Sequence, residues 1–336
     1  MDMLVALTSE GRIADQLRAT GVSVTILGET RMSRPFSVWR ARRGLRSLIR
    51  AQRPDVIVCH QSWPLAIFGP VAKHASIPLV VWMHMIASRF WLDRLAWRVK
   101  PETVVCNSRF VASTLPPSNA RVDVVYYPID VASNSVVRTG ELPRDESTAL
   151  KDDLVIIQVS RMEPLKGQSV LIEALGRLRE RSGWTCWLAG GAQRPSEEQY
   201  MQSLRVQAAA LGIADRIKFL GQRSDIKALL AGADIYCQPN AEPEAFGISL
   251  IEALAAGLPV VTSAIGGATE IIDDTCGILV APRDVTTLAS ELSTLLDDER
   301  RRARFGSGGP ARARALCNPA MRMPEIASIL QRAAAL

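Results

Sequence analysis

The sequence has little of what metal centres and disulfide-bonded domains require. Its 336 residues include only three histidines, His60, His74 and His84, and no Cys-x-x-Cys pair. The six cysteines are scattered, several of them in apolar runs, where cysteine behaves as a small hydrophobic residue. We therefore expect no metal ion, no other cofactor and no disulfide framework, in a protein of the reducing cytoplasm.

Long apolar runs and a large charge excess are also missing. The longest apolar segment, 77–87, contains a histidine and falls short of the roughly 18 residues that a membrane-spanning helix needs. We expect no signal peptide before the first strand. The net charge of +6 rests mainly on arginine and suits an anionic partner such as a nucleotide. Nucleic acid is the weakest reading of these arginines, because no basic-aromatic sheet motif accompanies them.

Short Val- and Ile-rich runs alternate with amphipathic segments in both halves of the chain, which is typical of parallel α/β structure. Strands are expected at 3–7, 23–27, 56–59, 79–84, 104–107, 122–126, 154–159, 185–189, 217–219, 235–238 and 260–262. Helices are expected at 12–20, 38–52, 64–75, 89–99, 108–115, 167–182, 197–211 and 248–256. The polar segment 131–152 is the expected linker. The pattern predicts two doubly wound, Rossmann-like domains facing a cleft at the carboxyl ends of their strands.

The most informative stretch is 237–261, which reads CQPNAEPEAFGISLIEALAAGLPVV. A buried strand ends there, a polar loop follows, and a helix begins near Ile248. Free backbone N–H groups at Gly247 and Ile248 form an anion site at the helix N-terminus. Glu244 and Glu252 lie on either side of it and can accept hydrogen bonds from hydroxyls. The alternative is that both are solvated charges favoured near a helix start. The expected ligand is polyhydroxylated and phosphorylated.

This stretch resembles the donor-site signature of retaining GT-B glycosyltransferases of the "glycosyl transferases group 1" family. The shared pattern is Glu, seven residues, Glu, with Phe-Gly after the first Glu and Glu-Ala-Leu-Ala-x-Gly-x-Pro-Val from the second. The resemblance implies that Glu244 is catalytic and holds sugar hydroxyls together with Phe246. It also implies that Glu252 holds the ribose, while Gly247 and Ile248 face the diphosphate.

A second motif, 160–168, follows the expected strand 154–159 and contains Arg161 and Lys166. The guanidinium of Arg161 offers a planar set of donors and Lys166 a compact positive charge, and together they suit the binding of a diphosphate. The alternative is a salt bridge within the loop, with Glu163 as partner. The run resembles the family's Gly-Arg-Leu-x-x-x-Lys-Gly motif, with Ser160 in place of the first Gly.

His84 ends the expected strand 79–84. A single histidine there is most often an ordinary side chain, but the family resemblance implies a catalytic histidine after this strand. Three further residues lie in loops that resemble the family's nucleotide-facing turns. We expect Gly190, Leu220 and Gln222 on the side of the base, and Glu270 in a structural role.

The family's chains open with a strand, a Gly-Gly loop and a helix that have no counterpart before residue 3. We therefore expect the first domain to lack its opening strand–loop–helix. The expected domains are 1–140, on the acceptor side and joined by the C-terminal helix 318–336, and 150–317, which binds the nucleotide-sugar donor.

Two basic segments with tryptophan, 39–53 and 89–100, resemble helices that lie on anionic membranes. We favour the simpler interpretation, in which their apolar stripes pack on the sheet, and keep peripheral contact with the inner face of the membrane as the alternative.

The sequence therefore predicts a retaining, metal-independent glycosyltransferase. It transfers a sugar from a nucleotide-diphosphate sugar to a glycan, lipid-linked or small-molecule acceptor. The alternative is a non-catalytic or impaired nucleotide-sugar-binding protein, because the N-terminal Gly-rich loop is missing.

Overall fold

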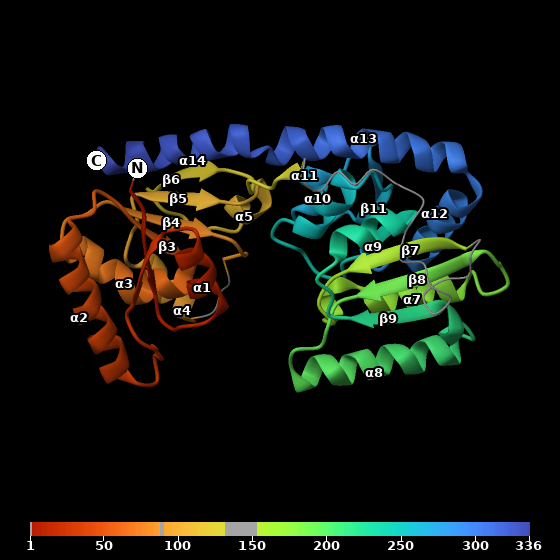
Figure 1. Ribbon diagram of the computed structural model, residues 1–336, viewed down its shortest axis with the longest axis horizontal. Coiled ribbons are helices and arrows are strands. Elements are labelled where there is room, and N and C mark those ends of the chain that lie inside the picture. The colour runs from red at the N-terminus through yellow and green to blue at the C-terminus, as the bar shows by residue number, and fades with distance from the viewer. Residues whose placement is uncertain (1, 88–90, 132–152) are drawn as a thin grey trace. The chain divides into compact units, whose positions relative to one another are not determined.

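The computed structural model describes residues 2–87, 91–131 and 153–336 and divides the chain into two compact units (Figure 1). The first comprises Met1–Asn107, Val111–Val125 and Glu325–Leu336, and the second comprises Ser108–Phe110 and Tyr126–Pro324. Of the expected linker 131–152, only Val131 is among the described residues. The domain bounds inferred from the sequence therefore remain a prediction.

The first unit contains two parallel sheets rather than one. The order of the elements is β1 (Leu4–Leu7), α1 (Arg12–Ala19), β2 (Ser23–Ile26), α2 (Pro35–Gln52), β3 (Ile57–His60), α3 (Ser62–His74), β4 (Leu79–Met83), α4 (Trp91–Trp97), β5 (Thr103–Cys106), α5 (Arg109–Ser113) and β6 (Arg121–Val124). β1 pairs with β2, and β3, β4, β5 and β6 form a separate sheet in that order. Each expected strand is present, with ends that differ by one or two residues.

The sheet β3–β6 is covered on one face by the last helix of the chain, α14 (Pro319–Ala334). Alternate residues of a strand point to opposite faces, and Val80 of β4 and Val105 of β5 both pack against Ile329 and Ala333 of this helix. On β4, Leu79, Val81 and Met83 are also buried, so this strand is apolar on both faces. The C-terminal helix expected at 318–336 is α14, Pro319–Ala334, and only its part from Glu325 belongs to the first unit.

The second unit is one doubly wound sheet with helices on both faces. Its elements are β7 (Leu154–Val159), η1 (Pro164–Lys166), α7 (Gln168–Gly176), β8 (Trp184–Ala189), α8 (Pro195–Ala210), η2 (Ala214–Arg216), β9 (Ile217–Gly221), α9 (Ile226–Gly232), β10 (Ile235–Gln238), α10 (Ile248–Ala255), β11 (Val260–Ser263), α11 (Ala268–Ile271), β12 (Gly277–Val280), α12 (Val285–Asp297) and α13 (Glu299–Cys317). The strand order is β12-β11-β10-β7-β8-β9, and all pairs are parallel.

Besides the short 3-10 turns η1 and η2, five elements of this unit were not expected from the sequence: α9, β12, α11, α12 and α13. The case of α13 has a clear cause, because its sequence FGSGGP combines glycine and proline, which disfavour helices. Tertiary packing overrides that preference. A Cβ on Gly306 would lie 2.4 Å from the carbonyl oxygen of Gly257, and one on Gly309 would lie 2.7 Å from that of Leu254. The glycines thus let α13 lie directly against the end of α10.

This packing predicts opposite effects for two glycine-to-alanine changes in helices. Gly306→Ala should lower the free energy of unfolding by about 1–3 kcal/mol, because the added methyl group overlaps the backbone of Gly257. Gly44→Ala in α2 should raise it by about 0.5–1 kcal/mol, because the nearest atom to its Cβ is a Leu27 methyl at 3.4 Å and alanine favours a helix. Calorimetric unfolding of both variants checks the pair; stabilisation by Gly306→Ala would contradict the close approach.

Candidate functional site

The candidate site lies where the order of strands in the second sheet reverses. From β7 the chain runs outward through β8 and β9, then returns to β10 on the other side of β7. Loops leaving β7 and β10 at their carboxyl ends therefore diverge, and ligands of doubly wound sheets bind at such a point. The loop after β7 carries Arg161 and Lys166, and the loop after β10 carries Glu244.

Two glycines allow the loop after β7 to approach the loops that follow β10 and β8. Gly167 has a φ of +74°, and a Cβ on it would lie 1.8 Å from the carbonyl oxygen of Pro239. Gly190 has a φ of +150°, and a Cβ on it would lie 1.8 Å from the carbonyl oxygen of Ser160. Both positions require glycine for its backbone conformation and for the close approach.

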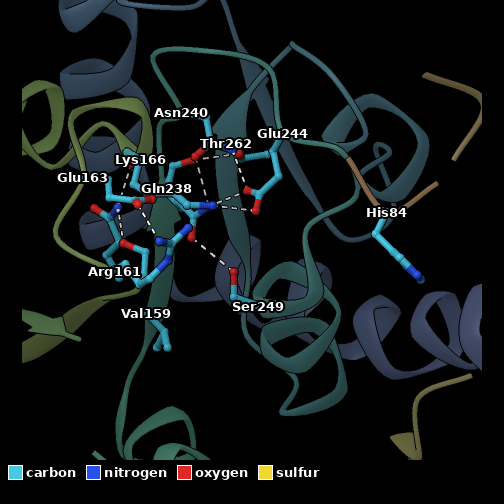
Figure 2. Close-up of polar contacts among 12 residues, drawn as sticks. His84, Val159, Arg161, Glu163, Lys166, Gln238, Asn240, Glu244, Ser249 and Thr262 are labelled. Atoms are coloured by element: carbon cyan, nitrogen blue, oxygen red, sulfur yellow. Dashed lines mark hydrogen bonds and ion pairs between the residues drawn. The ribbon is translucent and has the colours of Figure 1, made fainter. Parts of the chain in front are cut away.

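Lys166 and Glu244 form an ion pair across the switch point, with Nζ 2.6 Å from Oε1 (Figure 2). Their side chains are 13% and 19% exposed. The other carboxylate oxygen, Oε2, accepts hydrogen bonds from Nε2 of Gln238 at 3.0 Å and Nδ2 of Asn240 at 2.9 Å. Figure 2 shows both amides pointing toward this carboxylate. Glu244 is therefore held in one orientation, and the interpretation as a freely solvated charge is excluded for it.

Arg161 pairs with Glu163, at 2.5 Å between NH1 and Oε1. The salt bridge considered as the alternative from sequence is thus present. The Arg161 side chain is still 51% exposed, whereas Glu163 is 14% exposed. The guanidinium therefore retains solvent-facing surface beside the site.

The N-terminus of α10 provides backbone donors. Gly247 caps the helix with a φ of +113°, and no side-chain cap hydrogen bond is present there. The first N–H groups of a helix have no partner inside it, so those of Ile248 and Ser249 are available to an anion. The Phe246 side chain, in contrast, is 2% exposed and packs against Tyr126 and Tyr127. The predicted sugar contact of Phe246 is thereby restricted to its backbone.

Glu252 lies on α10 in a half-buried position. Burial raises the pKa of its carboxyl group above the ordinary value, and Lys227 opposes this shift. A carboxylate with few surrounding waters forms strong hydrogen bonds with hydroxyl groups, which suits the predicted contact with a ribose.

The three residues predicted on the side of the base gather at the ends of β8 and β9. Gly190 N donates to the carbonyl oxygen of Gly221 at 2.8 Å, and Leu220 precedes that residue in β9. A Cβ on Gly191 would lie 3.0 Å from the Cβ of Gln222, whose side chain is exposed. Gly190, Leu220 and Gln222 therefore belong to one rim of the sheet.

Glu270 has the structural position that its sequence context suggested. Its carboxylate accepts hydrogen bonds from the backbone N–H groups of Arg109 and Phe110, at 2.9 and 2.7 Å, and from the Tyr126 hydroxyl at 2.9 Å. It thus satisfies two backbone donors at the start of α5.

His84 lies in the first unit, directly after β4, and forms a pair with His60 that the sequence did not reveal. His84 Nε2 and His60 Nδ1 are 2.8 Å apart, and the rings are stacked with their centroids 5.1 Å apart. Trp82 stacks on both imidazoles. Partial burial and the neighbouring His60 lower the pKa of His84 to about 4.

Sequence reasoning also missed Gln238 and Asn240. Both are fully buried polar residues, Gln238 at the end of β10 and Asn240 just after it, and Gln238 bonds to Tyr236 on β10 and to Ser249 on α10. The available signal was an amide at the carboxyl end of a buried strand, two residues before another amide.

Among the described residues, no three His, Cys, Asp or Glu side chains form a group suited to a metal ion. None of the described helices has the length and apolar character needed to cross a membrane.

The histidine pair predicts a pH-dependent stability. The pKa of His84 is lower in the folded chain than the ordinary value of 6.5, so the unfolded chain binds the proton more readily. The resulting stability is complete above about pH 6.5 and should be lost as the pH falls toward 4. His60→Ala should move the pKa of His84 upward, because it removes the neighbouring imidazole and admits water. NMR titration of the imidazole signals measures this; an unchanged His84 pKa in the variant would contradict the coupling.

Two family models match the chain, one in each half. The model described as "Glycosyl transferases group 1" matches residues 141–312, and the model described as "Glycosyltransferase Family 4" matches residues 3–133. The first match contains all the site residues of the second unit described above, and the second contains His84.

Curated relatives show the same relationship. A D-inositol 3-phosphate glycosyltransferase of Salinispora tropica is 34% identical over 235 residues, 66% of this chain and 47% of that protein. A GDP-mannose-dependent alpha-(1-6)-phosphatidylinositol monomannoside mannosyltransferase of Mycolicibacterium smegmatis is 31% identical over 73% of this chain and 68% of that protein. The chain thus spans about half of the first relative and about two thirds of the second.

Among solved structures, Anabaena HepE in complex with UDP and glucose superposes with a TM-score of 0.85 at 26% sequence identity, covering 98% of this chain and 91% of that chain. The same protein has also been solved with UDP-glucose, with a TM-score of 0.85. The family and fold predicted from the sequence are confirmed: the chain belongs to the glycosyl transferases group 1 family, and its parallel, Rossmann-like units have the GT-B fold.

Proposed function

We propose that this protein is a retaining glycosyltransferase that binds a nucleotide-diphosphate sugar at the carboxyl edge of the second sheet. One observation carries the proposal: an ion pair, Lys166–Glu244, stands at the topological switch point beside the N-terminus of α10. A ligand that carries both phosphates and hydroxyls can replace both halves of this pair. Family membership and the UDP-glucose complex of HepE support the same ligand class.

In this proposal the cations of the site neutralise the leaving diphosphate. Arg161 and Lys166 contact its oxygens, and the N–H groups of Gly247 and Ile248 donate to it from the start of α10. Such fixed donors stabilise charge that develops in the transition state more than charge in the ground state. No metal ion is part of the proposal.

The carboxylates act on the sugar and the ribose. Glu244 binds sugar hydroxyls and stabilises positive charge at the anomeric carbon, and Glu252 binds the ribose hydroxyls. The bond between the anomeric carbon and the phosphate oxygen breaks. The acceptor oxygen bonds to the same face of the sugar and gives its proton to the leaving phosphate. His84, in the first unit, orients the sugar. The nucleotide base lies beside Gly190, Leu220 and Gln222.

The acceptor proposed here is a polyol, a glycan or a lipid-linked molecule. The two curated relatives described above are named for inositol 3-phosphate and for a phosphatidylinositol mannoside. Helix α2 supports a lipid-linked acceptor. On one face of this helix Val38, Ala41 and Leu45 are buried, which supports packing of its apolar stripe inside the unit. The opposite face carries a stripe of residues spaced by three or four positions: Phe36, Trp39, Arg43, Arg46 and Arg50.

This outer stripe of α2 suits an anionic membrane surface. Phe36 is 72% exposed and Trp39 is 49% exposed, and their rings stack with centroids 5.6 Å apart. The guanidinium of Arg43 lies over the Trp39 ring. Exposed aromatic rings followed by a row of arginines are typical of helices that lie in a bilayer interface.

The diphosphate clamp is tested by a pair of variants. Arg161→Ala should weaken binding of the cognate free nucleotide by about 1–3 kcal/mol, the scale for hydrogen bonds to charged groups. Glu163→Gln breaks the same ion pair but keeps the guanidinium, so it should bind at least as tightly as the unmodified chain. Calorimetric titration with UDP, GDP and ADP measures both. Equal affinities in all three proteins would overturn the clamp, and binding without hydrolysis of any donor sugar would favour the non-catalytic alternative.

Membrane contact is tested with vesicles. The chain should co-sediment with phosphatidylglycerol vesicles and not with phosphatidylcholine vesicles, and this binding should weaken as salt rises. Replacing Phe36 and Trp39 by Ser should reduce binding about tenfold or more, because each buried aromatic ring contributes on the order of 1.5–3 kcal/mol. The matched control is Trp91→Ser, which removes an exposed tryptophan of α4. Loss of binding in the control alone would assign the contact to α4.

A further inference from the structure

Gln238 is a buried polar side chain beside the proposed donor site, and both ends of its carboxamide are hydrogen-bonded. It is 0% exposed and sits at the end of β10. Its carbonyl oxygen accepts from the Tyr236 hydroxyl at 2.8 Å and from the Ser249 hydroxyl at 3.1 Å. Its amide nitrogen donates to Glu244 Oε2 and to Asn240 Oδ1, both at 3.0 Å.

These partners fix the direction of every hydrogen bond. The carboxylate of Glu244 offers only acceptors, so the NH2 group of Gln238 must face it, and the carboxamide oxygen is left to accept from the Tyr236 and Ser249 hydroxyls. Because Asn240 accepts from Gln238 through its oxygen, its own nitrogen is left to donate to Glu244, at 2.9 Å. Glu244 Oε2 therefore receives two neutral N–H donors, while Oε1 receives the ammonium group of Lys166.

The two sides of the carboxylate differ in what a ligand can change. Lys166 is a flexible cation, and in the proposed function it moves its hydrogen bonds to the diphosphate. Gln238 and Asn240 are 0% exposed, so their side chains cannot turn toward a ligand without losing their present hydrogen-bond partners. Once Lys166 has left, they are the only donors of this set that remain on Glu244.

We propose that Gln238 is a positioning residue for Glu244: together with Asn240 it keeps the carboxylate correctly oriented when Lys166 exchanges Glu244 for the donor diphosphate. The proposal rests on the proposed function. Through Ser249 on α10, the same carboxamide also ties Glu244 to the helix whose N-terminus faces the diphosphate. The buried amide of Gln238 thus fixes the position of the Glu244 carboxylate relative to the N-terminus of α10.

The sharpest test is Gln238→Glu, which keeps the shape of the side chain and replaces its NH2 group by an oxygen. That oxygen would face Glu244 Oε2 and Asn240 Oδ1, which are both acceptors. At neutral pH, hydrolysis of the cognate donor sugar should fall about tenfold or more, as for loss of a hydrogen bond to a charged group. Free nucleotide affinity should stay within about twofold, because the ribose and diphosphate contacts lie elsewhere.

The activity of this variant should recover as the pH falls, because one proton shared between the two carboxylates restores a donor. The other ionisable groups around the amide are Lys166, Tyr236 and Glu252. They are present in both proteins, so the ratio of variant to unmodified turnover at each pH isolates the new group. An equal loss at every pH, or a matching loss of nucleotide affinity, would overturn the positioning role.

The matched control is Gln207→Glu on α8, which makes the same charge change in an amide that bonds only to Ser169 in the described part of the chain. It should leave both turnover and its pH profile unchanged. If Gln238→Glu does not fold, Asn240→Asp removes the other donor to the same oxygen and carries the same expectation.

A readout without activity separates this proposal from the proposed function. Gln238→Met and Glu244→Gln should show a coupling in thermal unfolding, because the first change has less effect once the carboxylate is gone. An unmodified chain that neither binds nucleotide nor hydrolyses donor would overturn the proposed function. The double-mutant cycle of these two changes would still measure the interaction between Gln238 and Glu244. Additive effects in the cycle would overturn the positioning role whatever the activity.

Discussion

The half-buried ion pair of Lys166 and Glu244 is the interaction on which the second unit's site depends. Removing one member of such a pair is costly, about 3–5 kcal/mol when burial is complete, since it leaves the other charge uncompensated. The glycine at 167 lets the two loops meet, and the amides at 238 and 240 hold the acidic partner. The pair also explains the choice of ligand: a cation and an anion side by side match a molecule that offers phosphates to one and hydroxyls to the other.

Much of this site could be predicted because the relevant signals are local. Strand β7 is apolar except for Gln158 and ends where a run of polar residues begins. The helix start at Gly247 is marked by a glycine after a loop that contains proline. In a parallel sheet the carboxyl ends of all strands share one edge. The positions of Arg161, Lys166 and Glu244 at one edge follow from that rule.

The remainder depends on contacts between distant segments, which leave no local pattern. His60 and His84 end two neighbouring strands, and only the register of β3 against β4 brings their rings together. From the sequence alone Arg161 could bind a diphosphate or pair with Glu163; the fold forms that ion pair and leaves the guanidinium half exposed. Helix α13 was not predicted because glycine normally disfavours a helix. The close contact of these glycines with the end of α10, which favours the helix, is not visible in the sequence.

The position of α14 has a consequence for how the protein is made. Val80 and Val105 belong to strands synthesised early, whereas Ile329 and Ala333, which cover them, are synthesised after the whole second unit. During synthesis one apolar face of the sheet β3–β6 therefore stays exposed until α14 has been made. The second unit, whose sheet is continuous in sequence, can complete its core first. The order of folding would then run against the order of synthesis, and the nascent first unit is the natural client for a chaperone that shields apolar sheet surfaces.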